Sequence, residues 1–169
     1  MDTRLFGEPC RFGDLQPGDC FAFGEASSSQ GNGPDTTYVA VKSSLGATVL
    51  GPKHPLSKSG PKELSGPRFT STTHYRLPKA QIVPSSDLLH IHPGTGGIPQ
   101  KPGVLIHVAV GSPLLIVEDT GNERNWHYLD LATGQRIQIS DTTLTWFSAW
   151  KVVQKNIDDT YTVFAEFAL

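Results

Sequence analysis

The chain has 169 residues, a formal net charge of −2 and a hydrophobic fraction of 37%. This length allows one domain or two small ones, and the hydrophobic fraction is enough for a buried core. Lysine and arginine are scattered without a basic stripe, which argues against direct nucleic-acid binding. No apolar run is long enough to cross a membrane, and the N-terminus has no signal-peptide pattern, so we expect synthesis in a cytoplasm.

The chain is rich in residues that reverse its direction, with 17 glycines and 13 prolines. No long stretch shows helical periodicity without them, and this pattern predicts an all-β fold. The two cysteines, Cys10 and Cys20, flank a short turn. In a reducing compartment we expect two buried free thiols rather than a disulfide.

The first predicted unit follows an extended arm, residues 1–13, in which Leu5 and Phe6 are apolar anchors. The unit covers residues 14–83 and is interpreted as a small β-barrel with a 51–73 insertion loop. Its predicted strands are residues 20–23, 37–42, 47–50, 74–77 and 80–83. The insertion fits a functional loop or a tolerated surface insertion equally well.

A segment rich in proline and glycine, residues 84–103, is predicted to be a linker. Residues 104–169 then form a second small barrel that includes the C-terminal strand. The strand pattern of the first unit recurs at residues 113–117, 126–131, 136–139, 146–147 and 150–153. This repetition predicts two small barrels from an internal duplication, and small barrels usually bind other molecules rather than catalyse reactions.

The end of the chain is predicted to be an amphipathic strand. Alternation of side chains along a strand would place Tyr161, Val163, Ala165, Phe167 and Leu169 on one face. We expect this apolar face to be buried, either against the same barrel or against a neighbouring molecule.

Two histidines, His90 and His92, are the clearest candidates for chemistry, because residues two apart in a strand share a face. His107, His127 or Asp87 could supply a third metal ligand. A zinc site needs three or four converging ligands, and the spacing provides only two. We therefore expect no metal, and a small metal-dependent or ligand-binding barrel that uses His90 and His92 remains an alternative.

No catalytic motif is recognisable. Residues 94–97 have the glycine content of a phosphate loop, but no helix can start after them. The Gly-x-Ser-x-Gly nucleophile motif does not occur. Asp158 and Asp159 fit a hairpin turn better than a calcium site. We therefore expect a protein that is not an enzyme and that needs no cofactor.

Tryptophan is confined to the second half, at Trp126, Trp146 and Trp150. These residues could pack in a barrel core or anchor a partner at an exposed patch. Together with the arm and the last strand, they supply candidate partner-contact residues. The candidates are Leu5, Phe6, Trp146, Trp150, Tyr161, Val163, Phe167 and Leu169.

Residues 12–21 have the sequence FGDLQPGDCF, which resembles the opening of small SH3-like barrel proteins of tailed bacteriophages and prophages. YVAVK at 38–42 and LATG at 131–134 are similar to later parts of that pattern. The insertion at 51–73 departs from it. The resemblance implies two SH3-like barrels and a phage protein that is not an enzyme, and it assigns no functional residue.

The function expected from this resemblance is that of a structural virion protein, most specifically a capsid decoration or cement protein that bridges shell subunits. Its partners would be the major capsid protein or other virion proteins, together with copies of itself. The protein would be made in the host cytoplasm and would reside in the virion. The alternatives are a tail or connector component and a host-directed phage inhibitor.

Overall fold

The computed structural model describes residues 7–25, 36–51, 60–64, 74–87, 89, 91–93, 98, 100–109, 111–119, 122–139 and 144–169. These residues contain fifteen β-strands, one short 3-10 helix and no α-helix, which confirms the predicted all-β class. The strands are β1 (Glu8–Cys10), β2 (Cys20–Glu25), β3 (Thr36–Lys42), β4 (Ala47–Val49), β5 (Lys62–Leu64), β6 (His74–Arg76), β7 (Ala80–Pro84), β8 (Ile91–Pro93), β9 (Leu105–Val108), β10 (Leu114–Asp119), β11 (Asn122–Asp130), β12 (Arg136–Ile137), β13 (Leu144–Phe147), β14 (Ala149–Lys155) and β15 (Tyr161–Ala168).

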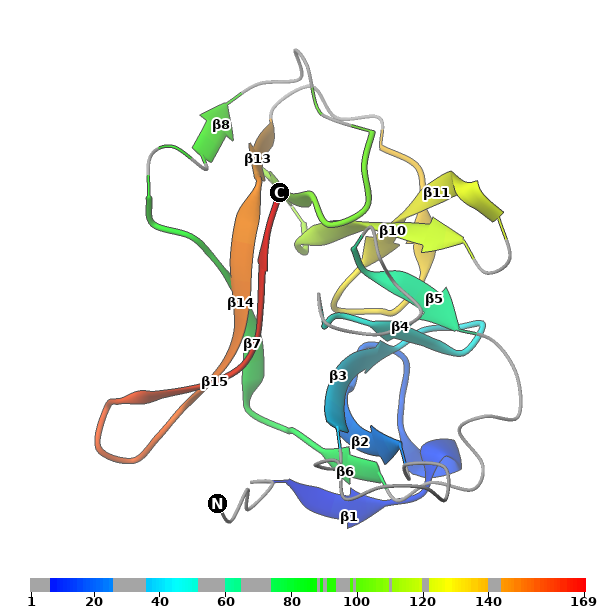
Figure 1. Cartoon of the computed structure of the whole chain (residues 1–169), viewed down its shortest axis with the longest axis vertical. Coiled ribbons are helices and arrows are strands. Elements are labelled where there is room, and N and C mark those ends of the chain that lie inside the picture. The colour runs from blue at the N-terminus through cyan, green and yellow to red at the C-terminus, as the bar shows by residue number, and fades with distance from the viewer. Residues whose placement is uncertain are drawn as a thin grey trace.

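Twelve strands form one large sheet in the order β1-β6-β2-β3-β4-β5-β10-β9-β13-β8, with β11 paired to β10 and β12 paired to β11. A second sheet has three strands in the order β15-β14-β7. Figure 1 shows this small sheet running along one side of the molecule, beside strands of both halves. Each strand predicted for the two repeated units is present within a few residues of its expected bounds.

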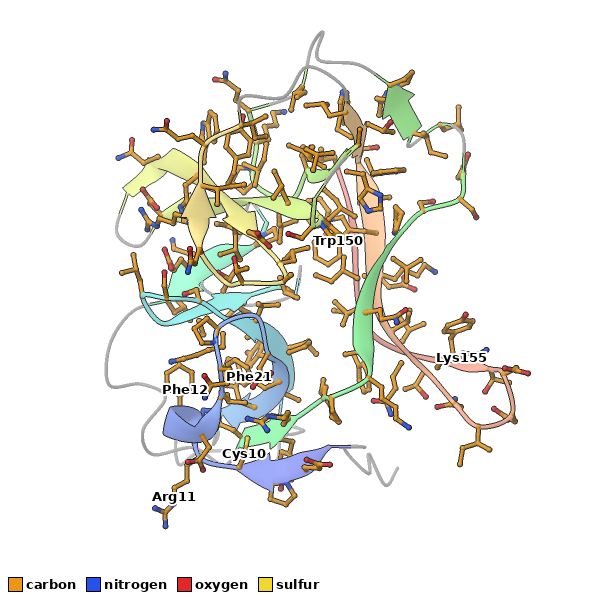
Figure 2. All side chains as sticks on the ribbon, turned by 180° about the vertical axis from the view of Figure 1, so that it is seen from behind. Cys10, Arg11, Phe12, Phe21, Trp150 and Lys155 are labelled. Atoms are coloured by element: carbon orange, nitrogen blue, oxygen red, sulfur yellow. The ribbon has the colours of Figure 1, made fainter. Side chains whose placement is uncertain are left out.

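Strands β2 and β3 bury both of their faces. Ala22 and Val39 lie in a central core, whereas the adjacent Phe21 and Tyr38 lie in a second core that belongs to the first half. In this second core Phe12, from the 3-10 helix η1 (Phe12–Asp14), packs edge-on against Phe21 with ring centroids 5.8 Å apart (Figure 2). Neighbouring residues of a strand point to opposite sides of the sheet. A strand that is buried on both sides therefore needs apolar residues at successive positions.

Strands β9 and β10 divide their side chains between two cores in the same way. Leu105 and Leu115 join the central core, and Ile106 and Ile116 join a third core that belongs to the second half. The central core therefore contains residues from both halves of the chain and lies between the two outer cores.

The three-stranded sheet contributes Trp150 and Phe167 to the central core. The Trp150 side chain is 1% exposed, and its Nε1 donates a hydrogen bond of 2.7 Å to the carbonyl of Gly103. The Phe167 ring stacks on Trp150 with centroids 5.4 Å apart and an interplanar angle of 17°. Figure 2 shows Trp150 between β14 and the large sheet, so this residue connects the two sheets.

The two halves of the large sheet meet where β5 pairs with β10 in parallel, with Lys62 opposite Glu118. The Lys62 ammonium lies 2.7 Å from the Glu118 carboxylate, and the Glu118 amide donates to the carbonyl of Pro61. Strand β5 belongs to the 51–73 segment that the sequence suggested to be an insertion loop. In the structure, this part of the segment connects the first half to the second.

The described strands form no closed barrel. Strand β7 is the last strand of the first predicted repeat and β14 is the last strand of the second, yet the two strands pair with each other over Ala80–Pro84. The predicted linker, residues 84–103, contains strand β8, which pairs with β13. The all-β class is therefore confirmed, whereas the finer prediction of two duplicated SH3-like barrels joined by a linker is not.

We expect the substitution Gly103→Ala to lower the free energy of unfolding by about 2–4 kcal/mol. Gly103 has a φ of +101°, and a Cβ at this position would overlap the Phe167 ring. Denaturant unfolding measures the effect. Gly51→Ala is the matched control, because a Cβ there meets no described atom within 4 Å. Equal stabilities for the two variants would contradict the assigned role of Gly103.

Candidate functional site

The β14–β15 hairpin extends away from the rest of the molecule (Figure 1). The Asn156 amide donates to the Thr160 carbonyl across the turn, and Asp159 adopts a φ of 61°. The Asp158 carboxylate accepts hydrogen bonds from the amide and hydroxyl of Thr160. These contacts confirm the hairpin turn predicted at Asp158 and Asp159, and they leave Ile157 fully exposed at its tip.

A β-bulge changes the face to which the side chains of β15 point. Val152 lies opposite Ala165, but Val153 lies opposite Val163, so Phe164 is an extra residue in the ladder. The prediction of a single apolar face from Tyr161 to Leu169 is therefore wrong. Because the bulge shifts the alternation by one residue, the C-terminal part of the strand turns its apolar side chains inward and the N-terminal part turns them outward.

The outward side chains form an apolar surface on the small sheet, in which Tyr161 is 58% exposed and Val163 is 45% exposed. We call this the hairpin surface, and its members are Val83, Ile157, Tyr161 and Val163. Leu169 is also exposed, but it follows Phe167 by two residues at the end of the chain and lies outside this surface. The ion pairs Lys151–Glu166 and Lys155–Asp159 lie on the same hairpin. No other described strand pairs with the outer edge of β15, so its backbone groups are open to a further strand.

The other candidate partner-contact residues lie elsewhere. Trp150 and Phe167 are in the central core, and Trp146 is buried in the third core. The burial of Trp146 and Trp150 agrees with the interpretation that the tryptophans pack in a core. Leu5 and Phe6 lie outside the described residues. Exposed contact residues are therefore provided by the hairpin surface.

The structure does not bring the described histidines together. His92 stacks on Trp146 with ring centroids 3.8 Å apart. His107 is opposite Thr145 in the same sheet, so it points to the other face from His92, which is opposite Trp146. His90 lies outside the described residues. Of the two predicted site residues, only His92 is described, and its ring is stacked on Trp146.

A charged cluster that sequence reasoning missed lies near the junction of β5 and β10. Arg136 Nη2 lies 2.5 Å from Glu63 Oε2 and 2.8 Å from Asp119 Oδ1. His127 Nδ1 lies 2.7 Å from the same Asp119 oxygen, and Ser43 donates to the other oxygen of Glu63 at 2.9 Å. The nearest sequence neighbours in this set, Asp119 and His127, are eight residues apart, and Glu63 and Arg136 are 73 apart. No local motif could have identified it.

Burial lowers the pKa of His127 below its ordinary value of 6.5, and the charge of Arg136 acts in the same direction. The hydrogen bond with Asp119 and the negative charges of Glu63 and Asp119 oppose this shift. The imidazole is therefore neutral at physiological pH. Of the two ring nitrogens, Nδ1 is the one that faces the Asp119 carboxylate.

An apolar pocket of about 400 Å³ lies between the two halves of the molecule. Its lining residues are Gly18, Cys20, Val41, Ala80, Gln81, Ile82, Pro113, Leu131, Ala132 and Val152. Burial, with the charge of Asp19, raises the pKa of the Cys20 thiol to about 12. Both Cys10 and Cys20 are free thiols.

Comparison with protein-family models, curated proteins and solved structures gives no match for this chain. The described residues contain no helix that is both long enough and apolar enough to cross a membrane.

We expect Cys20 to be inert towards thiol reagents in the folded protein. Only the thiolate reacts at an appreciable rate, and a pKa of about 12 leaves almost none of it near neutral pH. Counting reactive thiols should give Cys10 alone in the native protein and both cysteines in denaturant. Equal native rates for wild type and Cys10→Ser would contradict this expectation.

We expect acidification to destabilise the protein partly through His107, because burial lowers the pKa of this side chain below its ordinary value of 6.5. Below pH 6.5 the unfolded chain binds a proton that the folded chain does not, so stability decreases as the pH falls. The loss continues until the pH reaches the lowered folded-state pKa. Denaturant unfolding across this range should show a smaller pH dependence for His107→Gln than for wild type. An unchanged dependence would show that His107 does not contribute.

Proposed function

We propose that this chain is a structural virion protein of a tailed phage, and specifically a capsid decoration protein that attaches to shell subunits without catalysing a reaction. The observation that carries the proposal is the hairpin surface, with Ile157 fully exposed at the end of a projecting hairpin. An apolar side chain at such a position contributes nothing to the core. It gains roughly 25 cal/mol per Å² when a partner covers it.

The anchorage of the hairpin also supports an attachment role. Phe167 stacks on Trp150 at one end of β15, while Tyr161 and Val163 face solvent at the other. A hairpin held in this way can present its apolar side chains and the open edge of β15 with little loss of conformational freedom on binding. A partner could bury the side chains and add a strand to the edge at the same time.

The phage assignment within the proposal rests on the resemblance at residues 12–21. In this segment the Gln16 amide donates to the Asp19 carboxylate at 2.8 Å, which closes the turn before β2. The major capsid protein is the proposed partner, and further copies of the chain would occupy the same shell. A formal net charge of −2 suits many copies packed side by side, because their mutual repulsion is small.

We also propose that the two halves derive from a duplicated SH3-like unit. The antiparallel pairing of β7 with β14 places Ile82 opposite Val152, which are equivalent positions in the predicted repeats. The hydrogen bond from the Lys42 amide to the Asp19 carbonyl has a counterpart in the bond from Leu131 to Pro113. These relations are what an approximate twofold arrangement of two related units would produce.

We expect the double variant Ile157→Asp/Val163→Lys to lower the occupancy of the chain on purified phage heads by roughly tenfold or more, because it removes apolar contacts and adds charges that must be desolvated. The measurement is quantitative mass spectrometry of heads and tails separated on a density gradient. Leu45→Asp is the matched control, since Leu45 is exposed but lies outside the hairpin surface.

Thermal unfolding should first establish that both proteins remain folded. Normal occupancy of the double variant on heads would contradict the role of the hairpin surface. Absence of the wild-type chain from particles would contradict the virion proposal, and its presence on tails alone would make it a tail or connector component.

A further inference from the structure

Strand β7 has an edge that no other described strand covers. Its ladder partner is β14, and no described strand pairs with it on the opposite side. The Ser85 amide donates to the Ala149 carbonyl in the register of this ladder. Because bonded and non-bonded pairs alternate in an antiparallel ladder, Gln81 and Val83 also bond to β14. The backbone N–H and C=O of Ile82 therefore point away from β14, toward the free edge.

The open part of this edge is short. The Ala80 amide donates to the Leu77 carbonyl at 3.0 Å, and Pro84 has no N–H. Within β7, all of which is described, Ile82 is thus the residue that offers both an outward donor and an outward acceptor. A residue of a neighbouring strand is held by this pair of groups, because it donates to one and accepts from the other.

The apolar pocket adjoins the free edge of β7. Ala80, Ile82 and Val152 line it from the small sheet, and Cys20 and Val41 line it from the large sheet. In both views β7 lies between β14 and β3, so its free edge is turned toward the large sheet (Figure 1 and Figure 2). None of the lining residues has a charged side chain. The volume of about 400 Å³ is within the range of roughly 300–1,000 Å³ that is usual for ligand pockets.

The pocket lies where a side chain of an added strand would point. Ala80 and Ile82 pack against the central core, so they mark the inward side of β7. Side chains of a strand alternate between the two sides of its sheet, and a strand beside β7 would direct every second side chain inward. An apolar side chain in this position would enter the pocket, whereas a charged one would lose its hydration without gaining a partner.

We propose that the β7 edge and the adjoining pocket bind an extended peptide segment of a partner protein that carries a branched aliphatic or aromatic side chain. Its backbone would pair with Ile82, and its apolar side chain would fill the pocket. In strand addition, main-chain hydrogen bonds give affinity and side-chain pockets give specificity. The site is on the inward side of the small sheet, whereas the hairpin surface is on the outward side, so this proposal does not depend on the attachment role.

Titration of the ¹⁵N-labelled full chain with the capped peptides Ac-Thr-Leu-Thr-NH₂ and Ac-Thr-Asp-Thr-NH₂, followed by NMR, tests the site. We expect the leucine peptide to bind more tightly by about tenfold or more, because only an apolar side chain gains free energy in the pocket. The leucine peptide should also slow hydrogen exchange of the Ile82 amide, which acquires a hydrogen bond. The Val83 amide, which already bonds to β14, is the internal control and should keep its exchange rate.

A pair of variants separates the backbone bond from the side-chain contacts. Ile82→Pro removes the outward N–H without removing a ladder bond, and edge strands tolerate proline at such positions. Ile82→Ala is the matched control, because it shortens the same side chain and keeps the N–H. We expect the leucine peptide to bind about fivefold more weakly to Ile82→Pro than to Ile82→Ala. If Ile82→Pro does not fold, the two measurements on the wild-type chain decide the outcome.

The proposal is overturned if the leucine and aspartate peptides bind equally, if neither binds, or if exchange of the Ile82 amide is unchanged. Equal binding to the two folded variants would also overturn it. Sedimentation tests the other occupant, a second copy of the chain. A wild-type dimer that Ile82→Pro converts to a monomer, whereas Ile82→Ala does not, would show that the edge pairs with itself, and the partner peptide would be rejected.

Discussion

The contact on which the rest of the structure depends is the packing of Trp150 between the two sheets. The indole donates its N–H to the Gly103 carbonyl and carries the Phe167 ring on one face. Burying a tryptophan removes more apolar area from water than burying any other side chain, and the hydrogen bond satisfies its polar atom. Because β14 also pairs with β7 and β15, this residue fixes the position of the whole three-stranded sheet.

The central core around Trp150 explains how an exposed apolar hairpin can be held in one orientation. The core takes side chains from both halves, while each half also has an outer core of its own. Strands that are buried on both faces are difficult to displace, so the core against which β14 packs is rigid. The bulge opposite Val153 then turns Val163 outward, although Phe167 in the same strand faces inward. One strand thus serves both the core and the surface.

Electrostatics and hydrophobic packing act together where the halves meet. Glu63 and Glu118 are both about 1% exposed, and burial of a carboxylate is costly unless a cation and hydrogen bonds compensate it. Arg136 lies beside Glu63, and Lys62 lies beside Glu118. The pairing of β5 with β10 brings these charges together. The junction therefore depends on charge balance, whereas the cores on either side depend on apolar area.

The sequence alone determined the all-β class, the positions of the repeated strands and the turn at Asp158 and Asp159, because side-chain alternation and turn chemistry are local properties. The tertiary structure decided which strands pair. The β5–β10 contact, the bulge in β15 and the cluster of Glu63 with Arg136 join residues that are distant along the chain or depend on the ladder. Alternation of side chains along a strand indicates that the strand has two faces, but only its neighbours in space decide which face is buried.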